Sequence, residues 1–238
     1  MSSPLPPPPR PGRPPAAKQP VRAPLTRERI GDAALAIVDA EGLDGLSMRR
    51  VAERLGTGPA SLYAHVSGKE DLLQLLIDRV AAELPLPEPD PDRWQEQIKQ
   101  MVRDIHHGLL AHRDLARAAL ANIPLGEGAL AFSDRMVGVL RAGGLPDQVV
   151  GYASDLLPLY AVATAYEQSL YAEKMTTEEG ERYMREVGEY FAALPAERFP
   201  NLVALAGPLV DNSQDRFEFG LDVLVAGLAA YSRRASTA

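Results

Sequence analysis

Hydrophobic residues in the first third of the chain recur at intervals of three or four positions, which is the spacing of one face of a helix. One apolar stripe begins after Thr26, which suits a helix N-cap, and it stops at Gly42. Shorter stripes cover residues 48–55 and 59–66, and a longer one covers residues 69–84. The pattern therefore predicts four helices in this part of the chain.

Prolines separate these helices from a second helical region. They alternate with other residues through 85–93, and neither a helix nor a central strand accepts such a pattern. Apolar stripes then predict helices over residues 94–110, 113–122, 128–142, 146–172, 177–194 and 214–234. Pro158 should kink the longest of them because proline removes a backbone hydrogen bond. We interpret the proline-containing stretch 195–208 as a break.

No stretch alternates apolar and polar residues with a period of two, so the pattern indicates an all-α fold. We expect a small helical bundle in front and a larger one behind the proline-rich linker. Residues 1–25 contain ten prolines and no acidic residue, which predicts an extended, disordered basic arm. This arm is either a solubilising tail or an aid to non-specific DNA binding.

The composition excludes several classes of function that depend on cysteine or on a membrane-spanning segment. The 238 residues include no cysteine, which excludes disulfides, thiolate nucleophiles and cysteine-ligated metals. No apolar run approaches the length of about 20 residues that a membrane span requires. We expect a soluble, cytoplasmic protein without a membrane partner.

Charge is distributed unevenly along the chain. The formal net charge is −7, but residues 1–69 hold ten basic and six acidic side chains. The front of the chain is therefore basic and the remainder strongly acidic. A basic end on an acidic protein is compatible with binding a polyanion such as DNA, because phosphates respond to local charge.

The two short helices, joined by Gly56-Thr57-Gly58, have the form of a helix-turn-helix, whose second helix enters the major groove of DNA. The run 55–73, LGTGPASLYAHVSGKEDLL, resembles the DNA-binding signature of the TetR family of repressors. The preceding helices match that family as well, so the resemblance covers about residues 26–84. Val66 after His65 resembles the tetracycline-repressor-like subgroup.

Candidate DNA-binding residues follow from this motif. Small residues at the start of the third helix can approach base edges, and they lack the long donors that read guanine. More of the specificity then rests on apolar contacts, on Arg49 or Arg50 of the second helix and on DNA shape. By the resemblance, Tyr63, His65 and Lys69 hold phosphates. The alternative is that Tyr63 packs in the core and His65 caps a helix. The full candidate set is Thr57, Gly58, Pro59, Ala60, Ser61, Tyr63, His65, Lys69, Arg49 and Arg50.

The resemblance implies that residues 94–234 form a ligand-binding and dimerisation domain. Mixed methionine and aromatic residues suit adaptable apolar pockets, although such stripes also form ordinary cores. The candidate ligand-binding residues are Trp94, Met101, Ile105, Phe132, Met136, Leu156 and Tyr160. The candidate dimer interface on the last helix is Phe217, Leu221, Leu224, Val225 and Leu228, a stripe that could equally be internal, with Gly220 and Gly227 allowing close helix approach.

Histidines do not indicate a metal site. Adjacent helical residues point about 100° apart, so His106 and His107 do not share an ion, and no His-Glu-x-x-His spacing is present. We expect no cofactor and no metal, although either histidine could donate a hydrogen bond to an organic ligand.

The sequence as a whole predicts a DNA-binding repressor, a homodimer on a palindromic operator, released by a small apolar or amphipathic ligand. One alternative is a helical enzyme or metal protein, but no nucleophile elbow, glycine-rich phosphate loop or paired acid motif supports it. A second alternative is an all-α interaction scaffold whose basic end is incidental.

Overall fold

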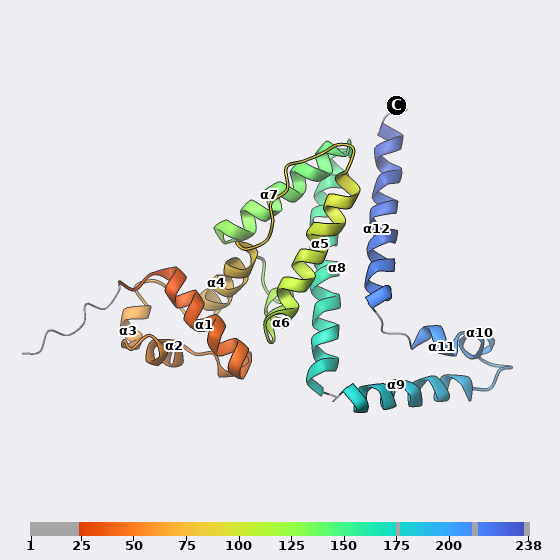
Figure 1. Cartoon of the computed structure of the whole chain (residues 1–238), viewed down its shortest axis with the longest axis horizontal. Coiled ribbons are helices and arrows are strands. Elements are labelled where there is room, and N and C mark those ends of the chain that lie inside the picture. The colour runs from red at the N-terminus through yellow and green to blue at the C-terminus, as the bar shows by residue number, and fades with distance from the viewer. Residues whose placement is uncertain (1–23, 175–176, 211–213, 236–238) are drawn as a thin grey trace, which may run out of the picture.

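The computed structural model describes residues 24–174, 177–210 and 214–235, and these residues form helices and connecting turns without any strand (Figure 1). The prediction of an all-α fold is confirmed. In the front region the elements are α1 (Arg27–Glu41), the short 3-10 helix η1 (Leu43–Gly45), α2 (Met48–Arg54), α3 (Pro59–Leu62) and α4 (Lys69–Ala81). The predicted arm at residues 1–25 lies almost entirely outside the described residues.

Side chains cap the first two helices where the sequence predicts. The Thr26 hydroxyl accepts a hydrogen bond from the Arg29 backbone N–H at 3.2 Å, and Ser47 does the same for Arg50 at 3.3 Å. Gly42 ends α1 with φ +75°, a conformation that side chains other than glycine rarely adopt. These caps supply partners for donors that a helix terminus otherwise leaves unpaired.

Two front helices are shorter than predicted. The third ends at Leu62 and not at Val66, because His65 N–H turns back to the Leu62 carbonyl at 2.8 Å, a three-residue bond that tightens the chain into a turn. The fourth ends at Ala81, and Glu83 and Leu84 make three-residue bonds of the same kind before Pro85. Both corrections concern helix ends, where the apolar stripe continues past the last helical turn.

The rear elements are α5 (Trp94–Leu110), α6 (Leu115–Leu120), α7 (Glu127–Ala142), α8 (Asp147–Lys174), α9 (Thr177–Ala192), α10 (Pro200–Ala204), α11 (Ala206–Leu209) and α12 (Gln214–Ala235). Helix α6 is shorter than the predicted 113–122, since Asp114 has φ +58° and interrupts the helical backbone. The break predicted over 195–208 contains α10 and α11. Pro200 occupies the first turn of α10, where its missing N–H costs nothing.

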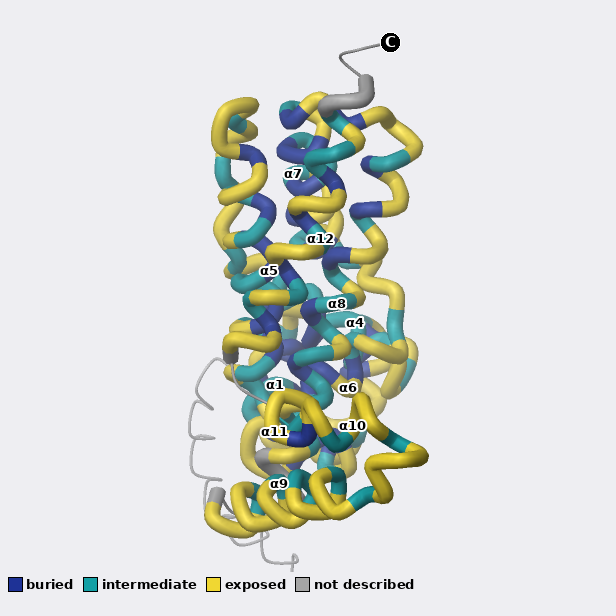
Figure 2. The backbone as a smooth tube through the Cα atoms, turned by 90° about the vertical axis from the view of Figure 1, so that its right-hand side faces the viewer, coloured by how far each residue is buried: buried dark blue, intermediate teal, exposed yellow. Residues whose placement is uncertain are grey.

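Buried side chains form two clusters. The first combines the front helices with Leu115, Ala116 and Ala118 of α6, together with Leu109 and Ala165 from the rear helices. The second fills the space between α5, α7, α8 and α12, and Figure 2 marks buried positions along these helices. The proline linker therefore does not separate two independent cores, because α6 belongs to the core of the front region.

Helices α9, α10 and α11 extend to one side of the rear bundle and pack mainly on each other (Figure 1). Tyr183 and Tyr190 of α9 are largely exposed. No helix of the described residues is long and apolar enough to cross a membrane.

Close packing of α4 on α7 generates a stability prediction. A Cβ at Gly128 would lie 2.9 Å from both the N and the Cα of Ala82, and backbone atoms do not move aside as a flexible side chain would. Gly128→Ala should therefore lower the free energy of unfolding by about 1–3 kcal/mol. Urea denaturation at fixed protein concentration measures this.

Gly31→Ala is the matched control. Gly31 also lies in a helix facing α4, but its added Cβ would have its nearest neighbour, the Leu75 carbonyl oxygen, at 3.9 Å. Alanine's better helix propensity should then leave stability unchanged or raise it by up to about 1 kcal/mol. Equal losses in the two variants would contradict the described packing.

Candidate nucleic-acid interface and effector cavity

The glycine turn between α2 and α3 presents α3 to solvent. Gly56 has φ +64°, and a Cβ at Gly58 would meet nothing within 4 Å. Pro59, Ala60 and Ser61 are exposed, while Leu62 is fully buried in the first core. One side of α3 therefore anchors the helix and the other side, made of small residues, is open for contact with a groove. Thr57, in the turn itself, is partly exposed.

Polar side chains surround the end of α3. Tyr63 is 57% exposed, so it does not pack in the core as the alternative interpretation would require. His65 is partly exposed in the following turn. Lys69, at the first position of α4, donates from Nζ to the Leu43 carbonyl at 3.1 Å, so its ammonium already has a protein partner.

Arg27 holds the turn that carries these groups, a role that the sequence analysis missed. Its guanidinium donates to the His65 carbonyl and pairs with Asp71 at 2.9 Å. Asp71 also accepts from the Ser67 backbone N–H at 2.9 Å. The hydrogen bond from Arg27 lowers the pKa of Asp71. No local pattern could reveal this contact, because 44 residues separate the two partners.

Arg49 and Arg50 of α2 are exposed and paired with acids. Arg49 lies 3.6 Å from Glu53 one turn along the helix, and Arg50 pairs with Glu41 at the end of α1. Surface pairs of this kind are weak, so either guanidinium can exchange its partner for a phosphate at little cost.

A cavity of about 420 Å³ lies behind the front region, between α4, α5, α6, α7 and α8. Its walls are mostly apolar, and they include Ile105 and Phe132 from the predicted ligand set. A few polar groups also face it: Asn122, Ser133, Ser154 and Asp155. Pro158 lines the cavity as well, and it lies inside α8, which remains helical on both sides of the proline. Size and lining are typical of a small-molecule site.

The remaining predicted ligand residues lie elsewhere. Trp94, Met101 and Met136 are buried in the second core, where their side chains pack between helices and do not line the cavity. Trp94 fills the space that a side chain at Gly143 would occupy. Leu156 is 43% exposed on the outer side of α8 and does not line the cavity.

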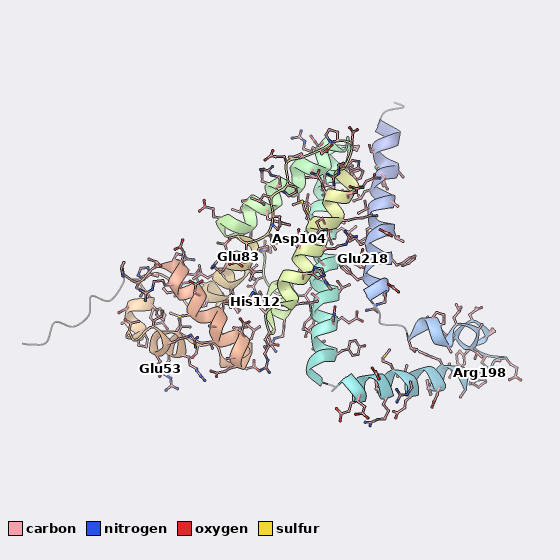
Figure 3. The ribbon with its side chains drawn as sticks, viewed as in Figure 1. Glu53, Glu83, Asp104, His112, Arg198 and Glu218 are labelled. Atoms are coloured by element: carbon pink, nitrogen blue, oxygen red, sulfur yellow. The ribbon has the colours of Figure 1, made fainter. Side chains whose placement is uncertain are left out.

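Tyr160 joins α8 to the last helix. Its hydroxyl donates to the Phe217 carbonyl at 2.9 Å, and a side chain at Gly220 would collide with it. Gly220 thus permits close approach of α12, as predicted, whereas an added Cβ at Gly227 would meet nothing within 4 Å. An ion pair between Arg103 and Glu218, at 2.7 Å, ties α12 to α5, and Glu218 is labelled in Figure 3. The Arg103 hydrogen bond lowers the pKa of Glu218.

Most of the predicted dimer stripe is turned inward. Phe217, Leu221, Val225 and Leu228 are buried against α5 and α8 within the same chain, and Leu224 is partly buried. The prediction that these side chains form the dimer interface is therefore corrected: a period of 3.6 identifies an apolar face but not its partner. Among the described residues of α12, the large hydrophobic side chains that stay exposed are Phe219, Val223 and Tyr231.

Among the histidines, His106 is the buried one. It is 1% exposed, it stacks on Phe217 with ring centroids 4.2 Å apart, and its Nδ1 has no hydrogen-bond partner. Burial lowers its pKa to about 4, so the ring is neutral at pH 7. Within the described residues no group of three or more His, Cys, Asp or Glu side chains could hold a metal ion.

Comparison with known families decides what this arrangement is. Residues 86–232 match the tetracyclin repressor-like C-terminal domain, and residues 30–76 match the bacterial regulatory proteins of the tetR family. The chain belongs to the TetR family. It is a ligand-responsive DNA-binding transcriptional repressor of the TetR type, and the enzyme and metal-protein alternative is not favoured.

Individual relatives agree with the family assignment. The chain is 33% identical over 219 residues to the transcriptional repressor DrrR1 of Streptomyces coeruleorubidus, covering 89% of this chain and 81% of that protein. It is 26% identical to the class D tetracycline repressor of Escherichia coli, over 85% and 88% of the two chains. The structure of ActR from Streptomyces coelicolor in complex with actinorhodin is 48% identical, with a TM-score of 0.82, and the match covers 87% and 97% of the two chains.

The buried histidine generates a prediction on acid stability. Unfolding releases His106 to its ordinary pKa near 6.5, so between pH 6.5 and about 4 the unfolded state binds the extra proton and the folded state loses stability as pH falls. His106→Leu removes this loss. The free energy of unfolding of His106→Leu minus that of the natural protein should therefore be about 2 kcal/mol larger at pH 5 than at pH 7.

Urea midpoints at the two pH values, with the protein concentration held constant, measure the difference. A stability difference that is the same at pH 5 and pH 7 would show that His106 is accessible to protons in the folded protein.

Proposed function

We propose that the chain represses transcription as a homodimer on an operator of two related half-sites, with α3 of each protomer in the major groove. The exposed small residues of α3, held by the buried Leu62, are the observation that carries this proposal. One helix-turn-helix reads few base pairs, so two half-sites supply the specificity. Such a role needs no catalytic group, cofactor or membrane partner. The protein would act in the cytoplasm, because the DNA is there.

The DNA contacts divide by chemistry. Thr57, Gly58, Pro59, Ala60 and Ser61 are proposed to face base edges, through hydroxyls and small apolar surfaces. Tyr63, His65 and Lys69 are proposed to contact phosphates, and Arg49 or Arg50 of α2 to contribute to specificity. Exposure of Tyr63 and the weak surface pairs of the arginines support this division.

The proposed dimer interface uses the outer faces of α8 and α12. Tyr152 and Leu156 of α8 are exposed, as are Phe219 and Val223 of α12, and the two helices pack on each other. These neighbouring apolar faces could join those of a second copy into a four-helix interface, and the inward-facing stripe of α12 would support them from behind.

The proposed effector is a small apolar or amphipathic molecule that binds in the cavity and lowers operator affinity. ActR, which shares nearly half of its aligned residues with this chain, has been solved with actinorhodin. We propose actinorhodin, or a molecule like it, as an effector of this chain too. The apolar walls and the few polar groups of the cavity support such a ligand.

Substitutions in the reading helix should separate the two kinds of contact. Tyr63→Phe should weaken binding to the operator and to random DNA by the same factor, because phosphate contacts carry no sequence information. Ser61→Ala should instead alter preference at one base pair in each half-site, by about 1–3 kcal/mol. Footprinting on the intergenic DNA beside the gene, followed by anisotropy titrations on operator variants, measures both effects.

The footprint of the natural protein should have two-fold symmetry. An asymmetric footprint of a single half-site would contradict the proposed dimer, and a change of base preference in Tyr63→Phe would contradict the division of contacts.

Filling the cavity should block the effector without harming DNA binding. Ser154 lines the cavity and its hydroxyl bonds only to the Val150 carbonyl of its own helix, so Ser154→Phe adds volume and removes no contact between helices. Actinorhodin should release the natural protein from its operator, and Ser154→Phe should need at least about tenfold more ligand. Anisotropy with labelled operator measures the release.

Ser169→Phe is the matched control, because Ser169 lies on the same helix, bonds likewise to its own backbone at Tyr166 and does not line the cavity. It should respond to actinorhodin as the natural protein does. Equal sensitivity of all three proteins would place the effector site outside this cavity.

A further inference from the structure

The effector cavity has a charge of one sign. Among the described residues that line it, Asp155 of α8 is the only one with an ionisable side chain, and no lysine, arginine or histidine is among them. Asp155 is exposed, and Leu159, one turn further along α8, likewise lines the cavity and is 49% exposed. These two residues therefore lie where the cavity meets solvent. The cavity has a carboxylate at its mouth and no positive side chain in its described walls.

This carboxylate has no partner within the part of the chain that the structure describes. Two other acids of α8 are paired: Asp147 meets Arg141 at 3.1 Å, and Glu167 meets Arg216. An acid at the mouth of a cavity, without a cation beside it, can accept hydrogen bonds from a ligand without first giving up a contact within the protein. Asp155 is therefore the acid of α8 that is suited to meet a ligand.

Hydrogen bonding by the neighbouring residue points to the same kind of ligand. Ser154 lines the cavity, and its hydroxyl donates to the Val150 carbonyl at 2.8 Å. A hydroxyl has one proton, so Ser154 can only accept from a ligand, and a carboxylate can only accept as well. The polar groups of α8 at the cavity thus require a donor. A protonated amine supplies both the donors and the opposite charge.

The position of Asp155 on α8 separates two parts of the site. Ser154 and Pro158 line the cavity, whereas Tyr152 and Leu156 are exposed on the outer side of the helix. Residues that follow each other in a helix point about 100° apart, so Asp155 lies between these two sides. An apolar ligand body can occupy the cavity while an attached amine extends toward solvent beside the carboxylate.

We propose that the cavity selects, among small molecules with an apolar body, those that carry a protonated amine, and that Asp155 is the residue that determines this specificity. Its carboxylate accepts from the ammonium group and repels a ligand with a carboxylate in the same place. This proposal rests on the proposed effector cavity and adds the class of ligand to it. Burial of the apolar body supplies affinity, and the charge at the mouth supplies the choice between ligands.

The test uses three fluorescent compounds with the same apolar body: pyrenemethylamine is cationic, pyrenemethanol is neutral and pyreneacetate is anionic. Fluorescence titration at pH 7 and constant ionic strength gives their affinities for the full-length protein. Asp155→Asn removes the charge at nearly constant size. Asp134→Asn is the matched control, because Asp134 is exposed on α7, does not line the cavity and carries the same charge.

The natural protein should bind pyrenemethylamine at least about tenfold more tightly than pyreneacetate, with pyrenemethanol between them. Asp155→Asn should reduce this ratio to about threefold or less, by weakening the amine and strengthening the anion. Its affinity for pyrenemethanol should stay the same, which a merely structural role of Asp155 would not produce. Asp134→Asn should retain the natural ratio.

Two results would overturn the proposal. One is a ratio of about threefold or less in the natural protein. The other is an equal ratio in Asp155→Asn and Asp134→Asn, which would assign any preference to the net charge of the protein and not to the mouth of the cavity.

Ser154→Phe distinguishes failure of this inference from failure of the proposed effector site, because it fills the cavity. If no compound binds, or if Ser154→Phe leaves the affinity for pyrenemethanol unchanged, the proposed site is wrong and this proposal is overturned with it. If Ser154→Phe weakens pyrenemethanol binding but the natural protein does not distinguish the charges, the cavity stands and only the role of Asp155 is overturned.

Discussion

The burial of α6 in the core of the DNA-binding region is the constraint on which the rest of the structure depends. Leu115, Ala116 and Ala118 are buried among residues of α1 and α4, although they follow the proline linker in sequence. Burying these side chains removes apolar surface from water, which is the main force that holds the two regions together. The relative position of the helix-turn-helix and the rear bundle is therefore fixed by packing and not by the length of a linker.

This packing places the cavity between the rear helices and α4 of the front region. Its walls include α4, which begins at the DNA-binding turn, and α6, which is bonded to the turn after α1. A molecule in the cavity contacts two elements that reach the DNA-binding region by different routes. The second core lies between α5, α7, α8 and α12, and closely packed interiors of this kind transmit displacement.

The helix-turn-helix was largely predictable because its determinants are local. Thr26 and Ser47 cap helices within three residues of themselves, and the glycine turn at Gly56 needs only its own backbone freedom. The contact of Arg27 with Asp71, which orders the turn around His65, could not be predicted, because its partners are 44 residues apart. The end of α3 at Leu62 was also missed, since an apolar residue at Val66 continued the stripe that defined the helix.

The cavity and the outer faces were less predictable. A helical stripe identifies the apolar side of each helix but does not indicate what covers it. Ile105 and Phe132 line the cavity, whereas Trp94, Met101 and Met136, chosen by the same reasoning, are packed in the core. Likewise Phe217 and Leu221 turned inward, and the exposed Phe219 and Val223 lie on the opposite side of the same helix.

The sequence by itself determined the all-α fold, the family and the position of the helix-turn-helix, because periodicity, caps and turn glycines act over a few residues. Only the tertiary structure decided where the cavity lies, which apolar faces remain exposed and how the two regions are joined. Those features depend on which helices pack together. Asp114 illustrates the difference: in sequence it is an acid in a loop, but its carboxylate accepts a hydrogen bond from the backbone N–H of Leu43, 71 residues away in sequence. A side chain at the neighbouring Gly42 would collide with that carboxylate.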